Sequence, residues 1–219
     1  MAMQLYAHPF SSYCQKVLIA LYENATPFEW RLLDEHNPQN MAELEAHWPF
    51  RRFPLLVDAG RAVSESSIII EYLQQQHPGA VRLIPDQAEQ ALEVRFMDRF
   101  FDLDISTPMQ KCVFDSMRPE AERDARGVTE ARQLLETAYR WLDAKLAQRP
   151  WAAGSEFSMA DCSAAPALFY ADWVQPIDAS LRNLRGYRQR LLARPSFARA
   201  VEEARPYRHL FPLGAPQRD

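Results

Sequence analysis

The segment QLYAHPFSSYCQKVLIALYE, residues 4–23, predicts the first two elements of the fold. Gln4 to Ala7 has the pattern of a short strand, and Tyr13 to Glu23 carries apolar side chains at helical spacing. A loop with one proline and two serines joins them, and residues that serve function often lie in loops of this kind. The sequence therefore predicts a strand and a helix with a candidate functional loop between them.

The following residues predict the remainder of a small α/β domain. We expect strands at residues 28–33, 55–57 and 62–63, and helices at residues 41–48 and 65–75. These elements give the order βαβαββα, which begins as a β-α-β unit and ends with an antiparallel hairpin. His77, Pro78 and Gly79 end the last helix.

Beyond residue 87 the sequence has helical periodicity and almost no strand pattern. We therefore expect a first domain at residues 1–79, a linker at 80–87 and an all-helical domain at 88–219. In the first helix of the second domain, Leu92, Phe96, Phe100 and Leu103 follow one face, and Pro108 is expected to kink or end it. Further helices are expected at residues 128–148, 159–173, 180–193 and 196–203.

Composition excludes several classes of protein. The chain has 219 residues and a net charge of -4, with cationic residues scattered among acids, which argues against nucleic-acid binding. Its six glycines are isolated, so a glycine-rich nucleotide-binding loop is not expected. Three dispersed cysteines and five histidines lack ligand spacing, and we expect neither a metal nor disulfides. No apolar run reaches about 20 residues, so we expect no membrane span and a cytoplasmic location.

The hydroxyl groups of Ser11 and Ser12 stand at the predicted start of a helix. Such hydroxyls commonly cap free backbone N–H groups. The same N–H groups and the positive end of the helix also stabilise an anion, including a thiolate. The residues alone leave both interpretations open.

Two further short motifs precede or open predicted elements. Pro54 follows Phe53 at the start of a strand, where a proline is tolerated or forms a cis bond. Glu65 and Ser66 open the last helix of the first domain, where they either cap it or bind a ligand. Each motif is weak evidence alone.

Taken together, the motifs resemble those of the glutathione transferases, in particular the bacterial soluble type. The resemblance covers nearly the whole chain and rests on four segments: SSYCQKVLIAL at 11–21, FPLL at 53–56, ESSIIIEYL at 65–73 and FSMADCSAAPAL at 157–168. It implies a thioredoxin-like N-terminal domain and an all-α C-terminal domain. In the last segment, Ser158 to Asp161 matches a capping box, which we interpret as structural.

The resemblance also implies a glutathione site. Ser11 corresponds to the catalytic residue that faces the glutathione sulfur, with Ser12 and Tyr13 as alternatives. The remaining binding residues that it implies are Arg52, Phe53, Pro54 as the family's cis-proline, Glu65 and Ser66. The loop formed by Trp48 to Arg51 departs from the family pattern, so we assign it no role.

A second pocket, for the electrophile, is expected between the two domains. Its candidate apolar lining is Phe10, Tyr13, Met109, Cys112 and Phe114. Cys14 lies where glutaredoxin-like motifs have their second cysteine, but the first is replaced by Ser11. Dithiol exchange is therefore not expected, and we interpret Cys14 as a packed residue.

The resemblance implies a glutathione transferase that adds the glutathione thiolate to a small hydrophobic electrophile. The resemblance further implies a cytoplasmic homodimer with a role in detoxification. Two alternatives remain open at this point. One is a glutathione-dependent disulfide reductase or isomerase, and the other is a binding module that keeps the fold without catalysis.

Overall fold

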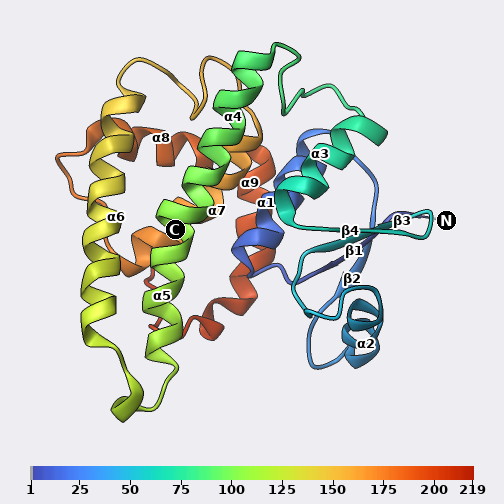
Figure 1. Cartoon of the computed structure of the whole chain (residues 1–219), viewed down its shortest axis with the longest axis horizontal. Helices are drawn as coiled ribbons and strands as arrows, with labels where there is room; N and C mark the ends of the chain where they lie inside the picture. Colours follow the sequence, from blue (N-terminus) through green and yellow to red (C-terminus); the bar gives the residue numbers. More distant parts are fainter. Residues whose placement is uncertain (1) are drawn as a thin grey trace.

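A four-stranded sheet with three helices forms the N-terminal part of the computed structural model, which describes residues 2–219 (Figure 1). The strands are β1 (Gln4–Ala7), β2 (Glu29–Leu32), β3 (Leu55–Asp58) and β4 (Arg61–Ser64), and the helices are α1 (Ser12–Glu23), α2 (Pro38–His47) and α3 (Ser66–Gln76). The strand order is β2-β1-β3-β4, with β1 and β2 parallel and the other pairs antiparallel. The predicted order βαβαββα is confirmed, although α2 begins three residues earlier than expected.

The two faces of the sheet pack against different helices. Alternate side chains of a strand point to opposite faces, so Leu5 and Leu56 join the core under α1 and α3. Tyr6 and Leu55 face the other way and contact Leu44 of α2. Figure 1 shows α1 and α3 between the sheet and the second domain, with α2 on the far side. The loop between β1 and α1 therefore ends beside the helical domain.

Helices make up the second part of the chain. They are α4 (Ala88–Phe100), a π-helical segment (Phe101–Ser106), α5 (Thr107–Ser116), α6 (Ala125–Leu146), α7 (Met159–Val174), α8 (Arg182–Leu192) and α9 (Pro195–Ala204), with short 3-10 helices at Glu120–Glu122 and Arg205–Leu210. The all-α class of this domain is confirmed. No helix within residues 2–219 is long and apolar enough to span a bilayer.

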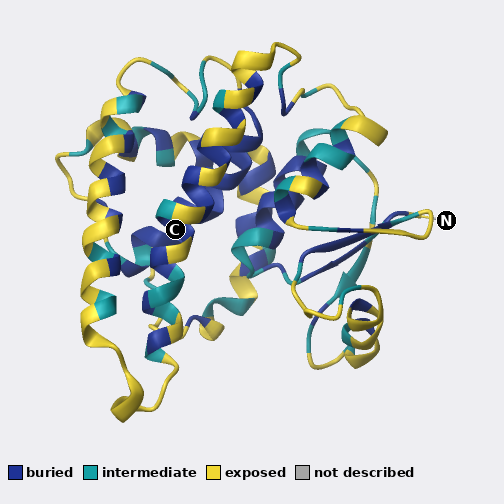
Figure 2. Ribbon diagram, viewed as in Figure 1, coloured by how far each residue is buried: buried dark blue, intermediate teal, exposed yellow. Residues whose placement is uncertain are grey.

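Helix α7 lies at the centre of this domain and packs against α1 of the first domain. Nearly all of its residues are buried, as Figure 2 shows. Its N-terminus carries the capping box expected at Ser158 to Asp161, with the Asp161 carboxylate accepting from the backbone N–H of Ser158 at 2.9 Å. The segment between α3 and α4, residues 77–87, contains no helix or strand.

The first helix of this domain differs from the expectation at Pro108. Helix α4 ends at Phe100, before the proline is reached, and a π-helical segment leads into α5, where Pro108 lies in the first turn and its missing N–H is tolerated. The face that carries Leu92, Phe96 and Leu103 is mostly exposed: Leu92 is 67% exposed and Leu103 58%. Val94 and Met97 on the other face are buried instead.

Candidate functional site

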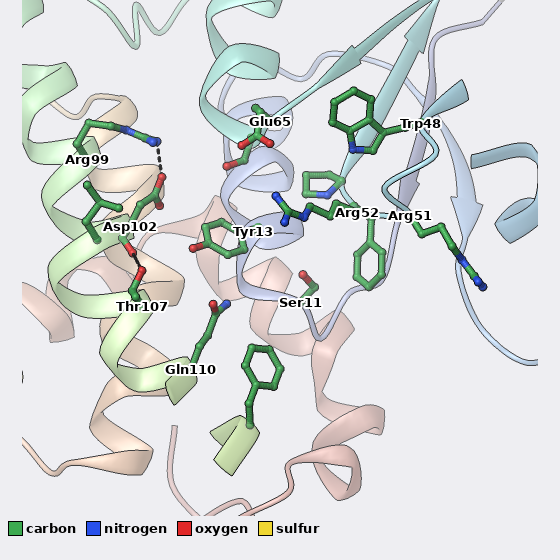
Figure 3. Close-up of a pocket in the computed structure, with 15 residues that line it drawn as sticks. Ser11, Tyr13, Trp48, Arg51, Arg52, Glu65, Arg99, Asp102, Thr107 and Gln110 are labelled. Carbon is green, nitrogen blue, oxygen red and sulfur yellow. Dashed lines mark hydrogen bonds and ion pairs between the residues drawn. The ribbon is translucent and has the colours of Figure 1, made fainter. Parts of the chain in front are cut away.

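A cavity of about 580 Å³ opens between the first domain and the α4–α5 helices. Its lining residues are Ser11, Tyr13, Trp48, Arg51, Arg52, Phe53, Pro54, Glu65, Ser66, Arg99, Asp102, Leu103, Thr107, Gln110 and Phe114. Figure 3 shows side chains from both domains directed into the space between them. The volume suits a small organic ligand.

Ser11 lies at the N-cap position of α1, at the floor of this cavity. Its backbone N–H donates to the carbonyl of His8 at 3.0 Å, and its own carbonyl accepts from the N–H of Gln15. Its side chain makes no capping hydrogen bond. The hydroxyl therefore remains available to a ligand beside the positive end of the helix. Ser12, the adjacent serine, is not among the lining residues.

Cys14 lies one turn below this position and is fully buried. Burial raises the pKa of its thiol to about 12, although a hydrogen bond with the side chain of Ser11 acts in the opposite direction. A thiol of this kind is protonated at neutral pH and has no access to a substrate. Cys14 is thus a packed residue, as expected, and not a nucleophile.

The loop before β3 supplies the next part of the cavity. The peptide bond between Phe53 and Pro54 is cis, as the resemblance implies. Within residues 2–219, neither the N–H nor the carbonyl of Phe53 has a hydrogen-bond partner. A free donor and acceptor side by side can pair with the backbone of an extended peptide. Arg52 precedes them with an exposed side chain.

Glu65 and Ser66 form the third part of the same wall, at the start of α3. Glu65 has φ 69°, in the left-handed region, and its exposed side chain makes no capping bond. A non-glycine residue in this conformation is often found at functional sites. Ser66 is 7% exposed, lines the cavity and begins the helix, so the first N–H groups of α3 have no partner within the helix, as at the start of α1. The wall thus offers two helix N-termini and one carboxylate.

The opposite wall comes mostly from residues that the sequence did not indicate. They are Arg99 of α4, Asp102 and Leu103 of the π-helical segment, and Thr107, Gln110 and Phe114 of α5. Only Phe114 was expected in this role. Arg99 and Asp102, three residues apart, form an ion pair, and this spacing on a helix is the one signal that the sequence offers.

A buried network of charges connects this wall with α1 and α3. The Lys16 ammonium contacts Asp98 at 2.7 Å and Asp102 at 3.0 Å, and it donates to the hydroxyl of Ser67 at 2.9 Å. Arg99 donates to the same hydroxyl at 2.7 Å. The network therefore joins both domains directly beneath the cavity.

Three residues expected in the electrophile pocket lie elsewhere. Phe10 packs against Tyr170 with ring centroids 5.4 Å apart, and its ring faces the helical core. Met109 and Cys112 are 4% and 3% exposed, because they occupy the buried face of α5. None of the three is among the lining residues, whereas Tyr13 and Phe114 are.

Metal binding gains no support from the part of the chain that is described. Across residues 2–219, histidine, cysteine and carboxylate side chains do not gather in any group of three or more.

Two domain models match the chain. One, described as the N-terminal domain of glutathione S-transferase, matches residues 5–80. The other, described as the C-terminal domain of glutathione S-transferase, matches residues 120–190. The first match spans Ser11, Pro54 and Glu65, and the second spans α6 and α7 together with most of α8.

Similar whole proteins carry related names. A probable glutathione S-transferase of rice is 29% identical over 155 residues, which are 69% of this chain and 64% of the rice protein. A probable maleylacetoacetate isomerase of Vibrio cholerae is 27% identical, over 94% of this chain and 98% of that protein. A glutathione S-transferase of Methylobacterium radiotolerans, solved in complex with glutathione sulfonate, superimposes with TM-score 0.79 and 29% identity, covering 92% of this chain and 95% of that one.

Proposed function

Because the chain belongs to the glutathione S-transferase family, we propose that it binds glutathione in this cavity and adds the thiolate to a small electrophile. One observation carries the proposal: a single cavity is lined by a hydroxyl at a helix N-terminus, by a free backbone donor and acceptor, and by a carboxylate at a second helix N-terminus. A γ-glutamyl tripeptide with a thiol offers a matching group for each.

Each wall residue has a proposed part in binding. Glu65 pairs with the ammonium of the γ-glutamyl group, and Ser66 with the N-terminus of α3 binds its carboxylate. The backbone of Phe53, fixed by the cis bond to Pro54, pairs with the cysteinyl residue. Arg52 reaches the glycine carboxylate. Ser11 is then left to face the sulfur.

The proposed catalytic role of Ser11 is to stabilise the thiolate of glutathione. A thiol with a pKa near 8.5 is only about 3% ionised at pH 7, and the thiolate is the nucleophile. Lowering that pKa by about 2 units takes about 2.7 kcal/mol. A hydrogen bond to a charged group contributes about 1.5 to 3 kcal/mol, and a helix N-terminus up to about 2. The Ser11 hydroxyl and the end of α1 are sufficient together.

In the proposed reaction the glutathione sulfur forms a bond to an electrophilic carbon. The electron pair of the broken bond leaves with a leaving group or moves onto an adjacent electron-withdrawing group. Tyr13, Leu103 and Phe114 provide apolar contacts for a small hydrophobic electrophile. Thr107 and Gln110 add polar groups on the same side, so an electrophile with a polar substituent also fits.

An isomerase is the second candidate function, since the Vibrio relative carries that name. Isomerisation begins with the same addition of the thiolate, but elimination then regenerates glutathione. Disulfide reduction would also use the thiolate of bound glutathione, because the chain's own Cys14 is buried and protonated. Measuring how much glutathione is consumed per turnover distinguishes addition, isomerisation and disulfide reduction.

The test of the proposal is the Ser11→Ala variant, with Ser12→Ala as its matched control. With an aryl halide at saturating glutathione, we expect Ser11→Ala to lower kcat about 10- to 100-fold and to raise the pKa of the bound thiol. Ser12 does not line the cavity, so Ser12→Ala should leave kcat and the pKa of the bound thiol unchanged. Equal activity of wild type and Ser11→Ala would reject the role of Ser11. Absence of binding to immobilised glutathione would instead favour the non-catalytic binding module.

A homodimer is part of the proposal. Leu92 and Phe96 of α4 are 67% and 47% exposed, and Phe96 contacts the ring of Trp141 on α6. An apolar surface of this kind on adjacent helices is typical of a protein interface. We assign it to a second copy of the chain, in an enzyme that acts in the cytoplasm on toxic electrophiles.

A further inference from the structure

Every backbone polar group of the Pro9–Ser11 loop is held by a specific partner. The N–H of Ser11 donates to the carbonyl of His8 at 3.0 Å, and the N–H of Phe10 donates to His8 Nδ1 at 3.1 Å. The carbonyl of Pro9 accepts from Gln15 Nε2 at 2.9 Å. The loop therefore moves only when one of these bonds breaks.

The remaining group, the carbonyl of Phe10, is held from the other domain. The hydroxyl of Tyr170, on α7, donates to it at 2.9 Å. The same hydroxyl accepts from Gln15 Nε2 at 3.1 Å, which links it to the carbonyl of Pro9. Gln15 and Tyr170 thus hold, by hydrogen bonds, the consecutive carbonyls of Pro9 and Phe10 immediately before Ser11.

Tyr170 is rigidly placed and does not touch the cavity. It is 4% exposed, and its ring contacts those of Phe10 and Trp173, each with centroids 5.4 Å apart. It is not among the lining residues, so it makes no contact with a ligand there. Any effect on the reaction must pass through the loop.

The side chain of Ser11 depends on that loop for its position. It makes no capping bond to the first turn of α1. Its hydroxyl is therefore placed by the backbone of the loop. Displacement of a reacting group by about 1 Å lowers the rate by up to about 100-fold. A hydrogen bond that holds the adjacent Phe10 carbonyl therefore affects the rate through the position of Ser11.

We propose that Tyr170 is a positioning residue, through which the helical domain holds Ser11 in the geometry that stabilises the glutathione thiolate. This inference rests on the proposed role of Ser11. It gives α7 a function beyond packing: the N-terminal domain supplies the hydroxyl, and the C-terminal domain fixes where the hydroxyl lies.

The first experiment compares Tyr170→Phe with Tyr139→Phe. Tyr139 is 1% exposed, lies in the same domain and donates to a single backbone carbonyl, that of Gln175, at 3.1 Å. Both variants keep the ring. Tyr139→Phe loses one hydrogen bond, and Tyr170→Phe loses two, the one donated to Phe10 and the one accepted from Gln15. We expect only Tyr170→Phe to raise the pKa of the bound thiol, by about 0.5 to 1 unit, and to lower kcat/KM about three- to tenfold at neutral pH. The affinity for S-methylglutathione, which has no ionisable thiol, should stay within about twofold in both variants.

The second experiment is a double-mutant cycle with Ser11→Ala. If Tyr170 acts through Ser11, adding Tyr170→Phe to Ser11→Ala leaves the thiol pKa where Ser11→Ala alone puts it. Independent, additive shifts would overturn the inference. An unchanged thiol pKa in Tyr170→Phe, with a raised one in Ser11→Ala, would overturn it and leave the proposed function intact. An unchanged pKa in Ser11→Ala would reject the proposed role of Ser11 itself.

A second variant keeps the test decisive if Tyr170→Phe does not fold. Gln15→Met preserves the length of a buried side chain and removes its bonds to Pro9 and Tyr170. We expect the same direction of change in the thiol pKa. A folded Gln15→Met with wild-type thiol pKa and kcat/KM would overturn the inference.

Discussion

The ammonium of Lys16 lies 2.7 Å from a carboxylate oxygen of Asp98, and each side chain is only 1% exposed. Lys16 belongs to α1 of the first domain and Asp98 to α4 of the second. A buried charge needs a partner, because the low-dielectric interior strongly disfavours an isolated ion. The contact therefore requires both domains to be folded and docked.

Replacing Lys16 with methionine should destabilise the protein strongly. The variant removes the ammonium that pairs with the carboxylates of Asp98 and Asp102 in a buried site. Removing one partner of a buried ion pair lowers the free energy of unfolding by about 3 to 5 kcal/mol. Urea unfolding measures the change in the free energy of unfolding. The control is Lys111→Met, which removes a partly exposed pair with Asp124 at 2.6 Å and should cost less than about 1 kcal/mol. Equal losses in both variants would contradict this account.

Glu65→Gln should weaken glutathione binding with little effect on folding. Its carboxylate is exposed and has no partner in residues 2–219, so the variant loses only the interaction with the ammonium of the ligand. A hydrogen bond to a charged group contributes about 1.5 to 3 kcal/mol, or about 10- to 100-fold in Kd. Calorimetric titration checks this value. Glu71→Gln, on the same helix and paired with Arg95 at 2.9 Å, serves as the control and should bind normally.

The sequence predicted the first domain well because its elements have clear local patterns. The apolar residues of β1 alternate and those of α1 recur at helical spacing. Pro54 directly precedes β3, and the hydroxyl residues Ser66 and Ser67 open α3. The α4–α5 region was less predictable. Helical periodicity identifies an apolar face but not whether that face is buried: Leu92 and Phe96 are exposed, whereas Val94 and Met97 are buried.

The two walls of the site also differ in how far the sequence predicts them. Ser11, Pro54 and Glu65 lie in short motifs that together resemble those of the glutathione transferases, and the resemblance implies their place in the site. Arg99 of α4 and Gln110 of α5 lie on either side of a π-helical segment, and both line the cavity through the tertiary packing of these helices, which no local motif indicates. Phe10 was misplaced because Tyr170, 160 residues away, draws its ring into the helical domain.

His8 should make stability depend on pH in mildly acidic solution. Burial lowers the pKa of its imidazole, which a charge interaction with Asp34 opposes, and its Nδ1 accepts from the N–H of Phe10. A folded-state pKa below the unfolded value of about 6.5 means that the unfolded chain binds the proton more tightly. Stability from this group is complete above about pH 6.5 and is lost as the pH falls. The edge of Tyr207 packs on the same ring, with centroids 4.6 Å apart.

The His8→Asn variant tests this dependence, because the asparagine oxygen can accept the same hydrogen bond without titrating. Unfolding free energies of wild type and variant are measured in parallel from pH 7.5 to about pH 5. We expect wild type to lose stability relative to the variant across this interval. Two parallel curves would mean that His8 keeps an ordinary pKa in the folded protein.

Tyr13 should not control ionisation of the bound thiol. Burial raises the pKa of its phenol to about 12, with the negative charge of Asp102 acting in the same direction. A raised pKa keeps this group protonated and neutral throughout the working range, so it does not act as the base that takes the thiol proton, and the hydrogen bond to the thiolate is assigned to Ser11. We expect Tyr13→Phe to leave the apparent pKa of kcat/KM unchanged and to alter only KM for the electrophile. A rise like that expected for Ser11→Ala would transfer the thiolate-stabilising role to Tyr13.

Phe96→Glu should convert the proposed dimer to a monomer. Phe96 is 47% exposed, its ring meets Trp141 with centroids 6.1 Å apart, and the ammonium of Lys145 lies over both rings. A carboxylate here needs no rearrangement of the monomer, since it remains in water and near Lys145, but a second copy would bury it unfavourably. Sedimentation velocity over a range of concentrations measures the change in mass. The control Leu210→Glu places the same charge at a 50% exposed position in the C-terminal 3-10 helix and should remain dimeric. A monomeric wild type would exclude this surface as a self-association site.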